Sequence, residues 1–181
     1  MKALTVNPSD HEVKELDIVM EANTVYSFFS SILIDHLSTL KDHTIYTDAN
    51  ALSNNKKAFF IGEQLLIGDA LITGLSNENT EIDTSIPINE LEELIDYELN
   101  DFYIQTLELL SKTDINLYRT FSCTKNNEKY QLNIEWVLYT FNIADERTKV
   151  YFLEEMKKNL QDTNQTQKFL EKMAQLALNA A

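Results

Sequence analysis

The sequence predicts an α+β protein: an antiparallel or mixed N-terminal sheet packed on an amphipathic helix, followed by a helix, a β-hairpin and two C-terminal helices. Two observations support this fold class. Short segments alternate apolar with polar residues, as half-buried strands do, and longer segments repeat apolar residues about every 3.6 positions, as helices do. The chain of 181 residues is long enough to bury a core of its own, so its stability requires neither a disulfide nor a metal.

The first twenty residues are predicted to form a β-hairpin. Residues 3–7 favour a strand, and residues 7–10, Asn-Pro-Ser-Asp, have the composition of a turn. The segment Val13–Met20 then alternates apolar with polar side chains, which indicates the second strand.

A long amphipathic helix is predicted next, from residue 23 to residue 40. Asn23 or Thr24 is the expected N-cap. The stripe positions recur at i, i+3, i+4, i+7, i+8, i+11, i+12 and i+15, as one face of a helix requires. They are Val25, Phe28, Phe29, Ile32, Leu33, His36, Leu37 and Leu40. A stripe of this width predicts that the helix packs on a sheet or on another helix.

The middle of the chain is predicted to contain two strands and a polar loop. The first strand is His43–Thr47. The second is Gln64–Thr73, a buried strand bent at Gly68, because glycine inside a strand often marks a bulge or a close backbone approach. The polar loop is Ser76–Ser85.

The second half is predicted to consist of a helix, a hairpin and two helices. The first helix runs from Asn89 to Leu110, with Asn89 and Glu92 in capping-box spacing. The hairpin lies within 117–141 around Lys125–Glu128, and its return strand is Tyr130–Leu138. The last two helices are expected at about 144–161 and 164–178. Their apolar stripes are Val150, Leu153, Met156 and Leu160 on the first, and Phe169, Leu170, Met173, Leu176 and Ala177 on the second.

We expect two regions, an N-terminal α+β module over residues 1–88 and a helix–hairpin–helix–helix extension over 89–181. No segment rich in Pro, Gly or Ser separates them. Because domain boundaries usually fall in such linkers, the sequence favours one shared core.

Negative charge is concentrated in the middle of the sequence. The chain holds 29 acidic residues against 15 Lys and Arg, a net charge of −14. Residues 58–111 contain twelve Asp and Glu but no Lys, Arg or His. This charge argues against direct binding of nucleic acid or of an anionic membrane, because both bind basic surfaces.

One interpretation of this window is an acidic interaction surface that binds a basic protein partner. Its predicted members are Glu78, Glu81, Asp83, Glu90, Glu92, Glu93, Asp96 and Asp101. The alternative is a solvated face that only aids solubility.

Three sequence features of the N-terminal half together resemble those of a known family. The opening Met1–Val6 leads through Asn7-Pro8 into a second strand, Asn54-Asn55 precedes an apolar segment, and Ile67–Gly74 contains a Gly-Asp-aliphatic motif. In these features the first 75 to 90 residues resemble an uncharacterised family from phages, plasmids and bacteria, a domain of unknown function. The resemblance implies an α+β N-terminal module and a mobile-element setting, and it assigns no activity and no site residue.

No catalytic, cofactor or metal residue is assigned. The chain has neither a P-loop motif nor G-x-G-x-x-G, so no cofactor is expected. His36 and His43 would form a metal site with nearby aspartates only if the predicted helix end folds back beside the next strand. The single cysteine, Cys123, is expected to be structural. Glu98 and Asp69 are the carboxyl groups for which burial is expected to shift the pKa.

The favoured function is that of a non-enzymatic interaction protein, which in a mobile-element setting would extend to mimicry of DNA charge. The alternative is a small-ligand or catalytic domain with a pocket near Gly62–Gly74. Self-association through the C-terminal helices is a further hypothesis. The N-terminus lacks the apolar run of a signal peptide and no apolar stretch is long enough to span a bilayer, so a cytoplasmic protein is expected.

Overall fold

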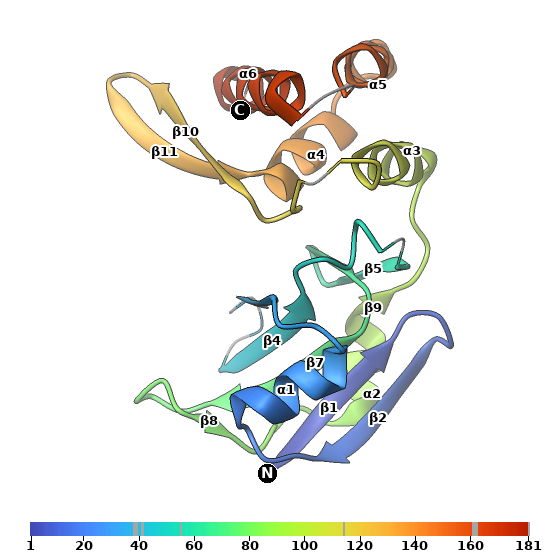
Figure 1. Ribbon diagram of the computed structural model, residues 1–181, viewed down its shortest axis with the longest axis vertical. Coiled ribbons are helices and arrows are strands. Elements are labelled where there is room, and N and C mark those ends of the chain that lie inside the picture. The colour runs from blue at the N-terminus through green and yellow to red at the C-terminus, as the bar shows by residue number, and fades with distance from the viewer. Residues whose placement is uncertain (38–39, 41, 55, 114, 161–162, 181) are drawn as a thin grey trace. The chain divides into compact units, whose positions relative to one another are not determined.

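The computed structural model describes residues 1–37, 40, 42–54, 56–113, 115–160 and 163–180, shown as a ribbon in Figure 1. The chain divides into two compact units. Unit 1 is Met1–Ala51 with Lys56–Leu99, and unit 2 is Leu52–Asn55 with Asn100–Ala181. The predicted α+β class is confirmed, because helices accompany antiparallel strands in both units.

The described residues of unit 1 form two sheets and two short helices. Its elements are β1 (Lys2–Asn7), β2 (Glu12–Asp17), α1 (Ala22–Phe29), β3 (Ile34–Leu37), β4 (His43–Asp48), β5 (Ala58–Ile61), β6 (Gln64–Ile67), β7 (Ala70–Leu75), β8 (Glu81–Ile82), α2 (Ile88–Leu94) and β9 (Ile95–Asp96). The larger sheet has the strand order β2-β1-β7-β4-β3, and β8 pairs with β7. The smaller sheet has the order β6-β5-β9.

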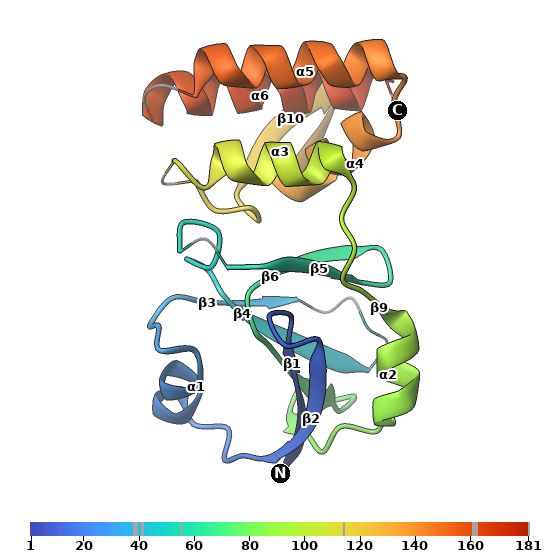
Figure 2. The same cartoon turned by 90° about the vertical axis from the view of Figure 1, so that its right-hand side faces the viewer.

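Apolar side chains pack on both faces of the larger sheet. One face places Leu4, Ile72 and Ile45 in a cross-strand row, and these side chains pack with Phe59 of β5 and Leu91 of α2. The opposite face carries Ala3 and Leu71 beneath α1. Figure 2 shows α1 and α2 on opposite sides of this sheet. Alternation along each strand therefore builds two separate apolar clusters.

In unit 2 the part of the chain that the structure describes forms a hairpin and four helices. Its elements are α3 (Asp101–Leu110), β10 (Thr120–Lys125), β11 (Glu128–Asn133), α4 (Ile134–Asn142), α5 (Glu146–Asn159) and α6 (Thr163–Ala180). The ring of Phe152 is central to the core: it stacks on Phe141 with centroids 4.2 Å apart and lies 5.8 Å from Phe102 and 6.1 Å from Phe169.

Several predicted elements are confirmed. The N-terminal hairpin pairs Lys2 through Asn7 with Asp17 through Glu12. The strand at His43 is β4, and the second hairpin turns at Asn126 and Asn127, both with positive φ as a two-residue hairpin turn requires. The last two helices are also present as α5 and α6, although residue 161 lies outside the described residues.

The predicted helix over residues 23–40 is wrong beyond Phe29. Ser30 adopts a left-handed conformation with φ of 53° and ends α1. The chain then forms β3, which pairs with β4 from Ile34 to Leu37. The apolar stripe fitted a helix, but pairing with a neighbouring strand decided the outcome, as tertiary contacts often override local propensity. Residues 38 and 39 lie outside the described part of the chain.

The predicted helix from Asn89 to Leu110 is two helices. Strand β9 interrupts it, because Ile95 and Asp96 pair with β5. Asn100 then caps α3 by accepting a hydrogen bond from the backbone N–H of Tyr103 at 3.2 Å. As a result α2 belongs to unit 1, and the units divide after Leu99, whereas the sequence suggested a division after residue 88.

One predicted strand is divided in two, and another is shorter than predicted. The strand over Gln64–Thr73 becomes β6 and β7, which belong to different sheets, because Gly68 turns the chain with φ of 77°. The return strand Tyr130–Leu138 ends at Asn133. The Asn133 side chain accepts a hydrogen bond from the N–H of Trp136 at 2.8 Å and starts α4 there.

Candidate functional site

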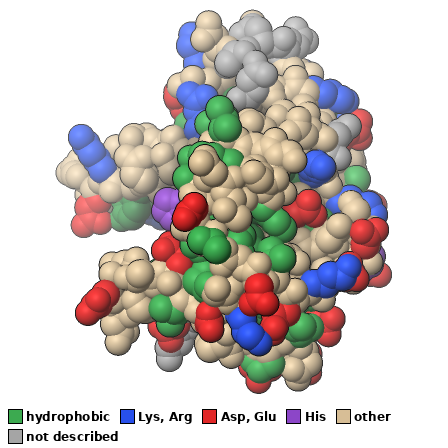
Figure 3. Space-filling view, turned by 60° about the horizontal axis from the view of Figure 1, so that its bottom comes forward, with side chains coloured by type: hydrophobic (Ala, Val, Ile, Leu, Met, Phe, Trp, Pro, Cys, Tyr) green, Lys and Arg blue, Asp and Glu red, His purple; other side chains and the backbone are tan. Residues whose placement is uncertain are grey.

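The predicted acidic residues are spread over several elements. They occupy the turn between β7 and β8 (Glu78), β8 (Glu81), the position after β8 (Asp83), α2 (Glu90, Glu92, Glu93), β9 (Asp96) and the first position of α3 (Asp101). Seven of them belong to unit 1, and Asp101 belongs to unit 2. Figure 3 shows acidic and hydrophobic side chains intermingled on the face that it presents.

Three of these eight carboxylates have partners within the fold. Glu81 accepts a hydrogen bond from the hydroxyl of Tyr46 at 2.6 Å. Asp83 accepts one from the backbone N–H of Lys2 at 2.9 Å, and Asp96 accepts one from the backbone N–H of Glu98 at 2.8 Å. These three carboxylates therefore also stabilise local structure.

The other five carboxylates are exposed: Glu78, Glu90, Glu92, Glu93 and Asp101. Within the described residues no salt bridge and no side-chain hydrogen bond engages any of them. Among the described residues no cationic side chain pairs with these carboxylates, so their charge is accessible to solvent, ions and a cationic partner.

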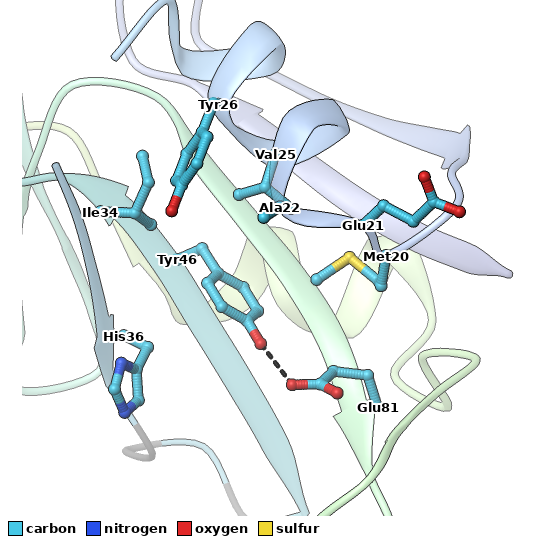
Figure 4. Close-up of a pocket in the computed structure, with 9 residues that line it drawn as sticks. All are labelled: Met20, Glu21, Ala22, Val25, Tyr26, Ile34, His36, Tyr46 and Glu81. Atoms are coloured by element: carbon cyan, nitrogen blue, oxygen red, sulfur yellow. Dashed lines mark hydrogen bonds between the residues drawn. The ribbon is translucent and has the colours of Figure 1, made fainter. Parts of the chain in front are cut away.

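A pocket of about 240 Å³ lies beside α1 within unit 1. We call it the α1 pocket. Its lining comes from the connection before α1, from α1 itself, and from β3, β4 and β8, as Figure 4 shows. The lining residues are Met20, Glu21, Ala22, Val25, Tyr26, Ile34, His36, Tyr46 and Glu81. Sequence segments as far apart as residues 20 and 81 thus meet here.

The pocket exists because α1 is too short to cover its face of the sheet. The helix has 8 residues and is about 12 Å long at 1.5 Å per residue. The five strands from β2 to β3 extend about 19 Å across at 4.8 Å per strand. Tyr46 of β4 and His36 of β3 are directly paired, so they share this face at the end that α1 leaves open.

The Tyr46–Glu81 hydrogen bond fixes the floor of the pocket. The pKa of Tyr46 is raised mainly by burial, and the neighbouring Glu81 carboxylate raises it further. The phenol therefore keeps its proton at neutral pH and donates it to Oε1 of Glu81. Figure 4 shows the two side chains joined across the pocket, while the carboxylate of Glu21 points away from them at the rim.

The two histidines considered as metal ligands do not converge. His36 is exposed on β3 and shares a face with Tyr46, whereas His43 is three positions earlier on β4 and so points to the opposite face. His43 is 6% exposed, and its Nε2 lies 3.3 Å from the backbone nitrogen of Ser85, which donates to it. Among the described residues, no three His, Cys, Asp or Glu side chains are grouped closely enough to hold a metal ion.

A second pocket, of about 210 Å³, includes Asp69 in the turn between β6 and β7. Thr5, Lys14 and Phe28 also line it. Burial raises the pKa of Asp69, as the sequence suggested, while the charge of Lys56 partly offsets the shift. Glu98, the other carboxyl group singled out, is exposed.

The remaining candidates have structural surroundings. Cys123 is buried on β10, and burial raises the pKa of its thiol, which disfavours the reactive thiolate. A Cβ atom at Gly74 would overlap the carbonyl oxygen of Asp83, so this glycine allows β8 to approach β7 closely. Among the described helices, none combines the length and the apolar character that crossing a bilayer requires.

No protein-family model matches this chain, and neither a curated protein nor a solved structure was found to be similar to it. The resemblance of the N-terminal half to a domain of unknown function therefore stays a prediction, and Asn55, one of its residues, lies outside the described part of the chain.

Sequence reasoning found part of the α1 pocket. It selected Glu81 for its charge and His36 as a metal candidate, but it gave no role to Tyr46 and assigned Tyr26 to core packing. One signal was available: Tyr46 alternates with Ile45 on a predicted strand, so it had to face the side opposite the main apolar row.

Proposed function

We propose that this protein is a non-enzymatic interaction module whose unit 1 binds a basic protein surface. One observation carries the proposal: unit 1 holds 18 Asp and Glu against 5 Lys and no Arg, a net charge of −13. Opposite charge on a partner would be attracted over roughly a Debye length, about 8 Å at physiological salt, and would speed association.

The exposed residues of α2 are the best place to test this function. Glu90, Glu92 and Glu93 are exposed on one short helix and have no salt-bridge partner among the described residues. Such surface carboxylates can pair with a cationic partner without first breaking an internal ion pair.

The test is fluorescence anisotropy of a labelled lysine-rich peptide with the full chain. The affinity should fall at least about tenfold between about 50 and about 500 mM NaCl, because the Debye length shortens about threefold. The triple variant Glu90→Gln, Glu92→Gln, Glu93→Gln should weaken binding about tenfold, since each lost charge near the contact contributes a few tenths to 1 kcal/mol.

A matched triple variant controls for total charge. Glu128→Gln, Glu154→Gln, Glu171→Gln removes the same charge from three exposed positions of unit 2. We expect this variant to bind within about twofold of the wild type, because these side chains are not part of the proposed surface. Equal weakening by both triples would mean that only total charge matters and would contradict the proposal.

The alternative function, a small-ligand site near residues 62–74, has one observation in its favour. The second pocket adjoins Asp69, in the turn that follows Gly68. A thermal-shift screen of small metabolites with the wild type and an Asp69→Asn variant separates the two functions. A ligand that stabilises the wild type but not the variant would favour this alternative.

A further inference from the structure

The chemistry of the α1 pocket is suited to a cation that has an apolar stem. The acidic groups are the carboxylates of Glu81 on the floor and Glu21 at the rim, His36 adds an imidazole, and none of the nine lining residues is Lys or Arg. Tyr26 and Tyr46 contribute aromatic rings, and apolar side chains of Met20, Val25, Ala22 and Ile34 complete the wall.

We propose that the α1 pocket receives one lysine or arginine side chain from the basic protein partner. This inference rests on the proposed function and deepens it, because it names a contact for one basic side chain of the partner, on the side of the larger sheet opposite to α2. The charged end would lie at Glu81, and the methylene stem would lie along the apolar wall, as long basic side chains do when their charged end is held.

The floor of the pocket is prepared for such a group. Tyr46 donates to Oε1 of Glu81 at 2.6 Å, and within the described residues no donor occupies Oε2. The carboxylate is thus held in place by one hydrogen bond while its second oxygen remains available for an ammonium or guanidinium group. The rings of Tyr26 and Tyr46 add cation–π attraction when a cation lies over a ring face.

The surroundings favour a protein segment over a free amine. Two exposed apolar residues directly precede lining residues in the sequence: Val19, which is 63% exposed, precedes Met20, and Leu33, which is 53% exposed, precedes Ile34. Apolar side chains exposed beside the pocket would be removed from water if a protein segment covered them. A partner that places a basic residue in the pocket would also cover these neighbours, which a small amine would leave in water.

The experiment follows the pocket methyl groups of the full chain by NMR. The probe is Nα-acetyl-lysine N-methylamide, and its control is the norleucine analogue, which has the same stem without the ammonium group. We expect the lysine probe to shift the methyl signals of Met20, Val25 and Ile34 saturably, and we expect the norleucine probe to leave them nearly unchanged.

Two substitutions separate the pocket carboxylate from nearby charge. Glu81→Gln removes the charge, retains an oxygen that accepts from Tyr46, and should weaken probe binding about tenfold, which is the loss of one charge-assisted contact. Glu78→Gln removes the same charge three residues away, outside the pocket, and should change binding less than about twofold. A third variant, Ala22→Leu, fills the pocket without changing its charge and should abolish binding.

The outcomes distinguish this inference from the proposed function. If Glu81→Gln and Glu78→Gln weaken the probe equally, or if the norleucine probe binds as well, the inference is wrong. If the lysine-rich peptide binds unit 1 but the pocket methyl groups do not respond, the function stands and the anchor is wrong. If the lysine probe occupies the pocket but the peptide does not bind, the partner function is wrong, and with it the anchoring role.

Discussion

The two units of this protein differ most in their net charge. Unit 1 has 18 acidic residues against 5 lysines, whereas unit 2 has 11 acidic residues against 10 Lys and Arg. In unit 2 the described ion pairs join helix neighbours, such as Lys149 with Glu146 and Lys158 with Glu155. Pairs at this spacing balance charge within one helix. The excess of negative charge is therefore confined almost entirely to unit 1, and a basic partner would be attracted mainly to that unit.

The cores differ as well. Unit 1 buries mainly aliphatic rows of its larger sheet together with Phe59, while unit 2 surrounds Phe152 with three other phenylalanine rings. Both side chains are fully buried, which allows one matched substitution in each core.

The largest expected effect comes from those substitutions. Phe59→Ala and Phe152→Ala should each lower the free energy of unfolding by about 3–5 kcal/mol, because each leaves a cavity as well as losing buried area. Hydrogen exchange measured by mass spectrometry should rise mainly in β1, β5 and β7 for Phe59→Ala, and mainly in α3, α5 and α6 for Phe152→Ala. If both variants raise exchange evenly along the chain, the two cores act as one cooperative unit and the comparison fails.

A medium effect is expected at Gly74 in unit 1. Gly74→Ala should cost on the order of 2 kcal/mol, because the new Cβ meets the backbone of Asp83 and pushes β8 away from β7. Since β8 carries Glu81, the variant should also lose the Tyr46–Glu81 hydrogen bond, which the chemical shift of the Tyr46 ring reports. Gly62→Ala is the control: nothing lies within 4 Å of its Cβ, so only the cost of its positive φ, about 1 kcal/mol, is expected. A smaller loss for Gly74→Ala than for Gly62→Ala would contradict the proposed close approach.

The smallest effect is expected at Asp69. Burial raises its pKa above the ordinary value of 3.8, so the folded state favours the protonated form. Stability is then greatest below that ordinary value and falls as the pH rises through the raised pKa. Asp69→Asn should therefore raise the melting temperature at pH 7 by on the order of 1–2 °C and leave it unchanged near pH 3. Glu63→Gln, an equal charge change at an exposed position, should have no effect at either pH. A lower melting temperature for Asp69→Asn at pH 7 would show that the charged form is the stabilising one.

The sequence predicted best where local chemistry alone decides the structure. The hairpin turn at Asn126 and Asn127 and the N-terminal hairpin follow from turn residues and alternation. The prediction was wrong where the secondary structure was determined by pairing with a distant strand or by a single helix cap. The stripe through Ile32 and Leu33 fitted a helix, yet both side chains are exposed, since pairing of β3 with β4 replaced the helix. Asn133 turned an alternating strand into a helix with one side-chain hydrogen bond.

The candidate site divides in the same way. The net charge of unit 1 can be counted from the sequence, because it depends on amino-acid composition and not on the fold. The α1 pocket cannot be located in this way, because Glu81 reaches Tyr46 across 35 residues only after β7 has brought β8 and β4 into one sheet. The uneven distribution of charge along the chain can thus be predicted from composition. The location of the pocket that brings Glu81 to Tyr46 depends on the topology of the sheet.

The asymmetry between the units is tested most directly by mapping the lysine-rich peptide on the full chain with backbone amide NMR. We expect perturbed signals in α2, in β8 and around Tyr46, with the helices of unit 2 nearly unchanged. Perturbations of equal size along α5 and α6 would show that the peptide does not distinguish the units, and would contradict the assignment of binding to unit 1.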